Sequence, residues 1–215
     1  MTALMLAAGG FLDPKQLLSN GGYALLFLII FAESGLLVGF FLPGDSLLFT
    51  AGAIAAGAFA PHLDVDFNVV VLCVGCFLAA VIGDQVGYLI GAKAGRRLFN
   101  RPDSRLFKKE YVDKAEGFFA RYGAKAIVLA RFVPVVRTFV PTVAGVSRMN
   151  YPLFLRFNLI GGLIWGVGVT LLGYLFGNIS YVKENFEIAI LGVVVLSLAP
   201  ILFEVLSHRR SAGQS

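Results

Sequence analysis

An apolar run long enough to cross a bilayer is broken near its middle by the sequence FLPGD, Phe41 to Asp45. Proline removes a backbone donor and glycine weakens a helix, so one regular membrane helix is not expected here. A second apolar run contains RFVPVVRTFVP, Arg131 to Pro141, with two prolines and two arginines. Irregular backbone at membrane depth is stable only when it is buried in protein or lines a wet cavity. We therefore expect the two broken runs to meet inside the protein.

The composition predicts an all-α polytopic membrane protein. The 215 residues are 58% hydrophobic and only 14% charged, whereas a soluble domain carries about 25% charge. The apolar runs are continuous rather than alternating, which argues against a β-barrel. The chain is expected to hold one membrane domain, residues 1–215, without a separate soluble catalytic domain.

Apolar length and helix-breaking residues divide this domain into segments. A crossing needs about 20 residues, and three runs meet that requirement: residues 67–90, 153–176 and 186–206. Two further runs contain the breaks; we name residues 22–60 the first broken segment and residues 123–150 the second broken segment. Asp13-Pro14 is typical of a helix start, and the following Asn-Gly-Gly of a helix end, so residues 13–20 are predicted to form a short interfacial helix.

Charge predicts the orientation. Residues 91–125 carry ten Lys or Arg against four Asp or Glu, which marks this stretch as cytoplasmic, with residues 91–122 forming a basic amphipathic segment. The basic tail, residues 207–215, is expected on the same side. The second broken segment must then start and finish on the cytoplasmic side, so it is predicted to be a re-entrant hairpin. The first is predicted to be a hairpin entering from outside, although a fully spanning first arm remains a competing topology.

A weak internal repeat links the two halves. FLP at 41, FN at 67 and GYLIG at 87 recur in order as FVP at 139, FN at 157 and GYLFG at 173. Under the predicted topology the two copies run in opposite directions through the membrane. Inverted repeats with broken helices are typical of transporters, whose site lies where the repeats meet. The fold expected is two opposed re-entrant hairpins in an inverted repeat, plus three spanning helices and interfacial amphipathic helices.

The broken segments bring charges of both signs into the membrane. Glu33 and Asp45 belong to the first, and Arg131 and Arg137 to the second. An ionised side chain at the bilayer centre costs about 2.5–3.5 kcal/mol, so the four are expected to pair. Two interpretations remain open. The pairs can simply hold the segments together, or the arginines can bind a phosphate headgroup while Glu33 or Asp45 carries a proton.

Other residues have secondary roles in this interpretation. Asp84 can pair with a basic residue or join the proton path, and Tyr88 can contact a headgroup or anchor the helix at the interface. Glycines recurring every four residues predict close helix packing. Prolines and a glycine in the broken segments predict helix breaks or hinges. The packing positions are Gly83, Gly87, Gly91 and Gly95, and the breaks are Pro43, Gly44, Pro134 and Pro141.

The sequence argues against an enzyme. A lipid phosphatase would need a nucleophile and an acid–base partner on one membrane face, but His62 and His208 are predicted on opposite sides. Cys73 and Cys76 lie in an apolar run and are expected to be buried rather than redox-active. No metal site and no cofactor are predicted. The basic stretch lies between membrane segments, which does not favour nucleic acid as a partner.

Three motifs together resemble a known family. FAESGLLVGFFLPGDSLL, GDQVGYLIGAKAG and RFVPVVRTFVPTVAG are similar to the DedA membrane proteins, which are related to the VTT or SNARE-associated Golgi proteins. The resemblance covers residues 22–180. It implies opposed re-entrant hairpins and proton-coupled translocation of undecaprenyl phosphate across the bacterial inner membrane. The family's essential acids fall on Glu33 and Asp45, and its essential arginines on Arg131 and Arg137.

The partners expected are therefore a membrane lipid and protons, with a homo-oligomer as a further possibility. Two other functions stay open: a passive phospholipid scramblase, which needs a polar groove but no proton site, and a proton-coupled exporter of small cations or drugs. The exporter would use Glu33 and Asp45 as its cation site.

Overall fold

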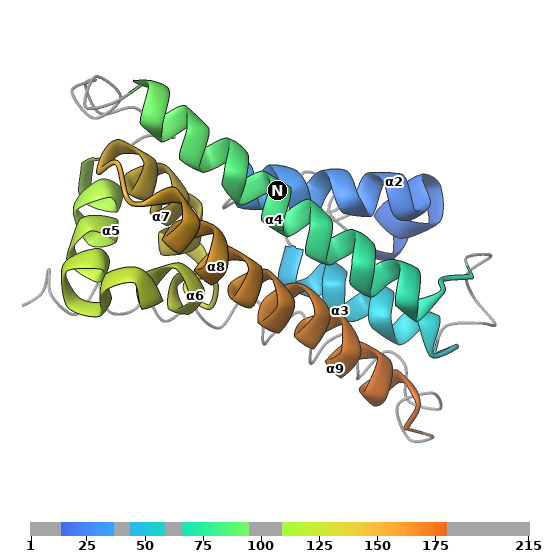
Figure 1. Ribbon diagram of the computed structural model, residues 1–215. Coiled ribbons are helices and arrows are strands. Elements are labelled where there is room, and N and C mark those ends of the chain that lie inside the picture. The colour runs from blue at the N-terminus through green and yellow to red at the C-terminus, as the bar shows by residue number, and fades with distance from the viewer. Residues whose placement is uncertain (1–13, 37–43, 59–65, 95–108, 180–215) are drawn as a thin grey trace, which may run out of the picture.

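The computed structural model describes residues 14–36, 44–58, 66–94 and 109–179, and the regular secondary structure in this part of the chain is all helical, without strands (Figure 1). The predicted third span, residues 186–206, and the tail, residues 207–215, lie outside the described residues. The helices in chain order are α2 (Pro14–Gly35), α3 (Gly44–Ala55), α4 (Val69–Ala94), α5 (Lys109–Tyr122), α6 (Ala126–Ala130), α7 (Pro134–Val146), α8 (Tyr151–Gly162) and α9 (Gly168–Gly177).

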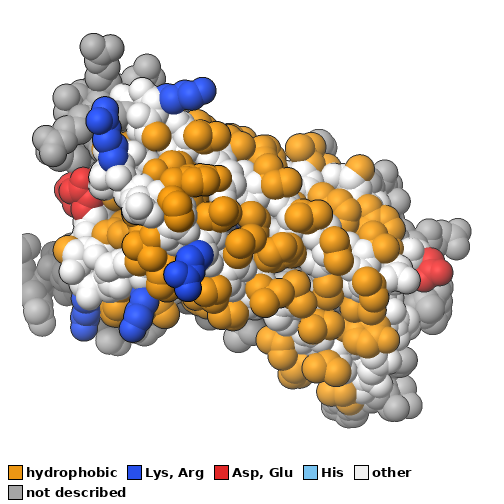
Figure 2. Space-filling view, viewed as in Figure 1, with side chains coloured by type: hydrophobic (Ala, Val, Ile, Leu, Met, Phe, Trp, Pro, Cys, Tyr) orange, Lys and Arg blue, Asp and Glu red, His pale blue; other side chains and the backbone are white. Residues whose placement is uncertain are grey.

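Two long apolar helices form the frame. One is α4, with 26 residues, and the other joins α8 to α9 through a π-helical segment, Leu163–Val167, in one rod of 27 residues. Both are long and apolar enough to cross a membrane, as predicted for residues 67–90 and 153–176. They run in opposite directions in Figure 1. Their outward side chains are large and apolar, and hydrophobic groups cover most of the face in Figure 2. This surface suits contact with hydrocarbon.

The first broken segment contains most of α2 and all of α3. Within α2, Gly22 has φ 53° and ψ −144°, a left-handed conformation that glycine adopts without the steric cost of a Cβ. The resulting kink lies where the sequence predicts the end of the short interfacial helix. After α2 ends at Gly35, α3 begins at Gly44, one residue beyond Pro43, which itself lies outside the described residues.

The second broken segment contains a 3₁₀ turn (Gly123–Lys125), α6 and α7. Its break lies between Ala130 and Pro134, because α7 begins at Pro134 after Val133 adopts an extended conformation. The prediction that Pro141 breaks the helix is wrong, since Pro141 lies inside α7. Proline there removes only the hydrogen bond to the carbonyl of Arg137, and burial of α7 against α4 compensates for that loss.

The place of Pro141 inside α7 also changes which residues of the two halves correspond in the internal repeat. The sequence contains FVP twice, at 132–134 and at 139–141. In the sequence FLP at 41–43 directly precedes α3, and the FVP copy at the start of a short helix is the one at 132–134, because α7 begins at Pro134. The match of FLP with the second FVP was therefore wrong, whereas the GYLIG and GYLFG copies keep equivalent places on α4 and α9.

Each half of the chain packs its second short helix on the long helix of the other half. α3 packs against α9, and α7 packs against α4. The glycines of the two repeats lie at these crossings: a Cβ on Gly91 would be 2.0 Å from the carbonyl oxygen of Thr142, and one on Gly173 would be 2.1 Å from that of Phe49. The backbones therefore touch directly, and no side chain larger than hydrogen fits at either position.

The other predicted packing glycines extend the same face of α4. A Cβ on Gly83 would lie 2.6 Å from the carbonyl oxygen of Phe31, and one on Gly87 would lie 3.2 Å from the Cβ of Pro141. α4 is therefore held against both α2 and α7 through these glycines. Gly95 lies outside the described residues.

We expect Gly145→Ala to destabilise the protein strongly. A Cβ there would lie 2.0 Å from the carbonyl oxygen of Tyr88 and 2.7 Å from the amide nitrogen of Ala92, so α4 and α7 must separate. Overpacking of this kind costs about 1–3 kcal/mol or more. The matched control is Gly117→Ala in α5, where a Cβ meets nothing within 4 Å. Thermal unfolding in detergent should show a lower Tm for the first variant only; equal Tm values would contradict the crossing.

Candidate functional site

Five charged side chains from both halves of the chain gather where the short helices meet. Glu33 lies near the end of α2, Asp45 in the first turn of α3, and Asp84 in the middle of α4. Arg131 follows α6, and Arg137 is in the first turn of α7. The N-terminal ends of α3 and α7 therefore both contribute to one cluster, where their backbone dipoles favour negative charge.

Arg137 holds the two carboxylates of the first half. Its Nη2 donates to Oε1 of Glu33, and its Nη1 donates to both oxygens of Asp45, at 2.9 and 3.0 Å. The two carboxylates differ in environment, because the side chain of Glu33 is 1% exposed and that of Asp45 is 44% exposed. Asp45 is therefore the most exposed side chain of the cluster.

Gly44 leaves room for the carboxylate of Glu33 because it has no side chain. A Cβ on Gly44 would lie 1.6 Å from Oε2 of Glu33, so the carboxylate occupies the space that any other residue would fill. The backbone N–H of Gly44 also interacts with the carboxylate of Glu33. Gly44 thus marks the start of α3 and at the same time forms one wall around Glu33.

A second buried ion pair lies beside the first. Nη2 of Arg131 donates to Oδ2 of Asp84 at 2.5 Å and to Oδ1 of Asn158 at 2.7 Å. Asn158 in turn donates through Nδ2 to the carbonyl oxygen of Val81, at 3.1 Å. Arg131 therefore pairs with Asp84 rather than with Glu33 or Asp45. Of the two roles considered for Asp84, the structure shows the pairing with a basic residue.

Trp165 connects the two ion pairs. Its indole Nε1 donates to Oδ1 of Asp45 at 2.7 Å, and its ring lies 5.3 Å from the guanidinium carbon of Arg137 and 5.9 Å from that of Arg131. Sequence reasoning missed both Trp165 and Asn158. The available signal was their polar hydrogen-bonding groups within the apolar run 153–176.

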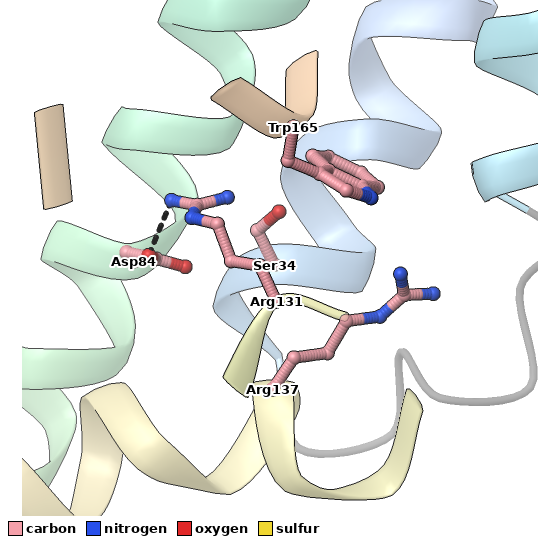
Figure 3. A pocket seen from close by; sticks show the side chains of 5 residues that line it. All are labelled: Ser34, Asp84, Arg131, Arg137 and Trp165. Atoms are coloured by element: carbon pink, nitrogen blue, oxygen red, sulfur yellow. Dashed lines mark hydrogen bonds and ion pairs between the residues drawn. The ribbon is translucent and has the colours of Figure 1, made fainter. Parts of the chain in front are cut away.

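A small pocket lies between these groups. It is lined by Ser34, Asp84, Arg131, Arg137 and Trp165; in Figure 3 the guanidinium of Arg131 is turned toward Asp84, whereas that of Arg137 extends away from this pair. Its free space accommodates about one water molecule. The Nε atoms of both arginines are buried and have no hydrogen-bond partner among the described residues. The two arginines that line the pocket thus keep unused donors, and the pocket as it stands is too small for a phosphate.

The cluster as a whole is not neutral when every group is ionised. Three carboxylates, those of Glu33, Asp45 and Asp84, face two guanidinium groups. One negative charge is therefore left over in a site that is largely buried. An uncompensated buried charge is costly, so a carboxylate of this site that loses its guanidinium partner is stabilised by binding a proton.

Tyr88 lies outside this site. Its hydroxyl donates to the carbonyl oxygen of Met149 at 2.7 Å, and its ring stacks on Phe154 with centroids 4.5 Å apart. The suggested contact with a headgroup is therefore replaced by a structural link between α4 and the start of α8. Within residues 14–36, 44–58, 66–94 and 109–179, no group of three or more His, Cys, Asp or Glu side chains is placed to hold a metal ion.

Comparisons with known proteins assign the chain to a family. A VTT domain model matches residues 42–175. Escherichia coli Protein DedA is 46% identical over 194 residues, covering 90% of this chain and 86% of DedA. The Mycobacterium tuberculosis uncharacterized membrane protein Rv0364 is 47% identical over 224 residues, covering 100% and 96%. The E. coli inner membrane protein YqjA is 36% identical over 157 residues, covering 73% and 68%.

No solved structure gives a significant match to this chain. The family match spans α3 to α9 and includes Asp45, Asp84 and both arginines of the cluster, while the alignment with DedA extends over most of the chain. Together with the two long apolar helices, these matches show that the chain is a helical membrane protein and that it belongs to the VTT-domain family, which includes DedA.

Proposed function

We propose that this protein moves an anionic lipid across the bacterial inner membrane in exchange for, or together with, protons, and that undecaprenyl phosphate or a related prenyl phosphate is its substrate. The observation that carries this proposal is the pair of buried arginines that line one pocket, each with an Nε atom that has no hydrogen-bond partner among the described residues. A guanidinium group matches a phosphate bidentately, and this match is strongest where water is excluded.

The membrane arrangement in this proposal is two re-entrant hairpins, formed by the first and second broken segments. Their helices α3, α6 and α7 are shorter than a bilayer crossing, and each half packs on the other half's long helix. The Lys and Arg side chains visible in Figure 2 lie toward the end of the molecule that carries α5. We assign that end to the cytoplasm, following the excess of basic residues in cytoplasmic segments.

Transport begins with opening of the closed pocket between the halves. The phosphate then replaces the carboxylates as the partner of Arg137, and Arg131 supplies further donors from the opposite wall. Glu33 loses its charge partner in a dry environment and takes a proton, which neutralises it. Rocking of the two halves exposes the headgroup to the other leaflet while the prenyl chain remains in lipid. Release of the phosphate returns Arg137 to Glu33 and Asp45.

Reconstitution in liposomes tests this function. Headgroup accessibility is followed for a prenyl phosphate and for an ordinary phospholipid, with and without a pH gradient. We expect the prenyl phosphate to move selectively and faster with the gradient. Equal movement of both lipids, indifferent to the gradient, would indicate a passive scramblase instead. Gradient-driven loss of a cationic dye without lipid movement would indicate the exporter.

Glu33→Gln is expected to remove the effect of the pH gradient without preventing folding. The amide keeps the shape of the side chain and can still accept from Arg137, but it cannot bind and release a proton. Transport should fall by about 10²-fold or more, as when a general acid–base group is removed. Arg156→Gln, on the exposed face of α8, is the control and should transport normally. Gradient-driven transport by Glu33→Gln would assign the proton to another group.

A further inference from the structure

We infer that Trp165 is a positioning residue that holds Asp45 as a carboxylate while Arg137 is engaged by phosphate, so that Glu33 is the group that takes the proton. This inference rests on the proposed function and assigns different roles to Asp45 and Glu33 in that site. It concerns a residue that the charged motifs do not include.

The two acids keep different partners when Arg137 turns away. Asp45 retains the indole N–H of Trp165, at 2.7 Å, and is partly open to water. Glu33 is buried and retains its interaction with the backbone N–H of Gly44. A hydrogen bond to the ionised form stabilises that form, whereas burial favours the neutral form. The proton therefore goes from water to the carboxylate of Glu33, and Asp45 stays charged.

The position of Trp165 does not depend on Arg137 alone. The indole ring also lies against Arg131, with 5.9 Å from the guanidinium carbon to the ring centroid, and Arg131 is fixed by Asp84 and Asn158. Trp165 is 2% exposed, so the ring is packed on its other sides as well. Departure of Arg137 thus leaves the ring one cationic neighbour and its bond to Asp45.

The backbone places the indole through an irregular turn. Trp165 lies in the middle of the π-helical segment Leu163–Val167, a feature that is frequent at functional sites because it redirects side chains. Next to it, Gly166 lies close to the backbone of α4, where an added Cβ would be 3.4 Å from the carbonyl oxygen of Cys76. The carbonyl of Gly166 accepts from Thr170 Oγ1 at 2.7 Å, which satisfies a group in the widened turn.

A spectroscopic test is available because Trp165 is the single tryptophan of the chain. Labelling with indole-¹⁵N tryptophan gives one side-chain N–H resonance in detergent or nanodiscs. In the ligand-free protein we expect a downfield, hydrogen-bonded proton that moves upfield in Asp45→Ala, which removes the acceptor, but stays in place in Glu33→Gln. A resonance that does not move in Asp45→Ala would overturn the contact, and this result does not depend on any lipid.

The same resonance tests the role during binding. Farnesyl phosphate is the probe, and farnesol, which lacks the phosphate, is the control. The inference requires the resonance to keep its hydrogen-bonded position when farnesyl phosphate saturates the site. An upfield shift with farnesyl phosphate but not farnesol would show that the bond to Asp45 breaks, which overturns the inference. Failure of farnesyl phosphate to bind would overturn the proposed function itself, and with it the role of Trp165, while leaving the ligand-free contact in place.

Transport by Trp165→Phe completes the test. Phenylalanine keeps an aromatic ring against the guanidinium groups but removes the N–H, so Asp45 then competes with Glu33 for the proton. We expect the rate to fall about tenfold, the effect of losing one hydrogen bond to a charged group, and the pH dependence to broaden from one titrating group to two. A lower rate with an unchanged pH profile would assign Trp165 a packing role and overturn the inference.

Discussion

Arg137→Ala is expected to abolish transport and to lower the free energy of unfolding by about 3–5 kcal/mol. Arg137 is the shared partner of Glu33 and Asp45, and one of these carboxylates is almost completely buried. Its removal leaves Glu33 buried without its guanidinium partner, so the carboxylate either stays uncompensated or takes up a proton, and both outcomes lower the stability. Thermal unfolding in detergent measures the stability, and the liposome assay measures the transport of prenyl phosphate.

A second variant separates the loss of charge balance from the loss of the phosphate ligand. Arg137→Ala combined with Glu33→Gln removes one charge of each sign, so most of the stability should return while transport stays absent. Arg156→Ala, on the exposed face of α8, is the control for removing an arginine and should change neither property. A stable, transporting Arg137→Ala protein would contradict the assignment of Arg137 as the central ligand.

Asp84→Ala is expected to have the second largest effect. It leaves Arg131 buried with Asn158 as its remaining hydrogen-bond partner among the described residues, and breaking a buried pair in this way costs about 3–5 kcal/mol. Replacing both partners by apolar residues, Asp84→Leu with Arg131→Met, should restore the stability, because a buried ion pair contributes little compared with well-packed apolar groups. Unfolding of Asp84→Leu, Arg131→Met and the double variant, compared with the wild type, measures the coupling between the two side chains.

Transport by the double variant decides what Arg131 does. If Arg131 binds phosphate, the double variant folds like the wild type but fails to transport. If the pair only holds α4 to the second broken segment, transport returns together with stability. The same comparison separates the two interpretations that the charged residues alone leave open.

Much of this site follows from the sequence because membrane burial restricts where charge can go. Glu33, Asp45, Arg131 and Arg137 had to find partners, and the structure brings all four into one cluster. The GYLIG and GYLFG repeats lie at equivalent crossings in the two halves, as an internal repeat requires. Apolar length was sufficient to place α4 and the rod from α8 to α9.

The identity of each partner could not be predicted, because pairing depends on crossing geometry that no short motif encodes. Arg137 takes both Glu33 and Asp45, and Arg131 takes Asp84. The π-helical turn that directs the indole of Trp165 toward Asp45 has no recognisable sequence signal. Pro141 shows the limit of local rules: its preference against a helix interior is real, but the packing of α7 on α4 outweighs it.

Proton uptake on lipid binding tests the central claim most directly. The claim is that phosphate replaces carboxylates at Arg137 and that a carboxylate is neutralised as a result. Farnesyl phosphate is titrated into the purified protein in weakly buffered solution with a pH indicator. The account predicts uptake of about one proton for each phosphate bound, and its loss in Glu33→Gln. Saturable binding of farnesyl phosphate with no proton uptake by the wild-type protein would contradict it.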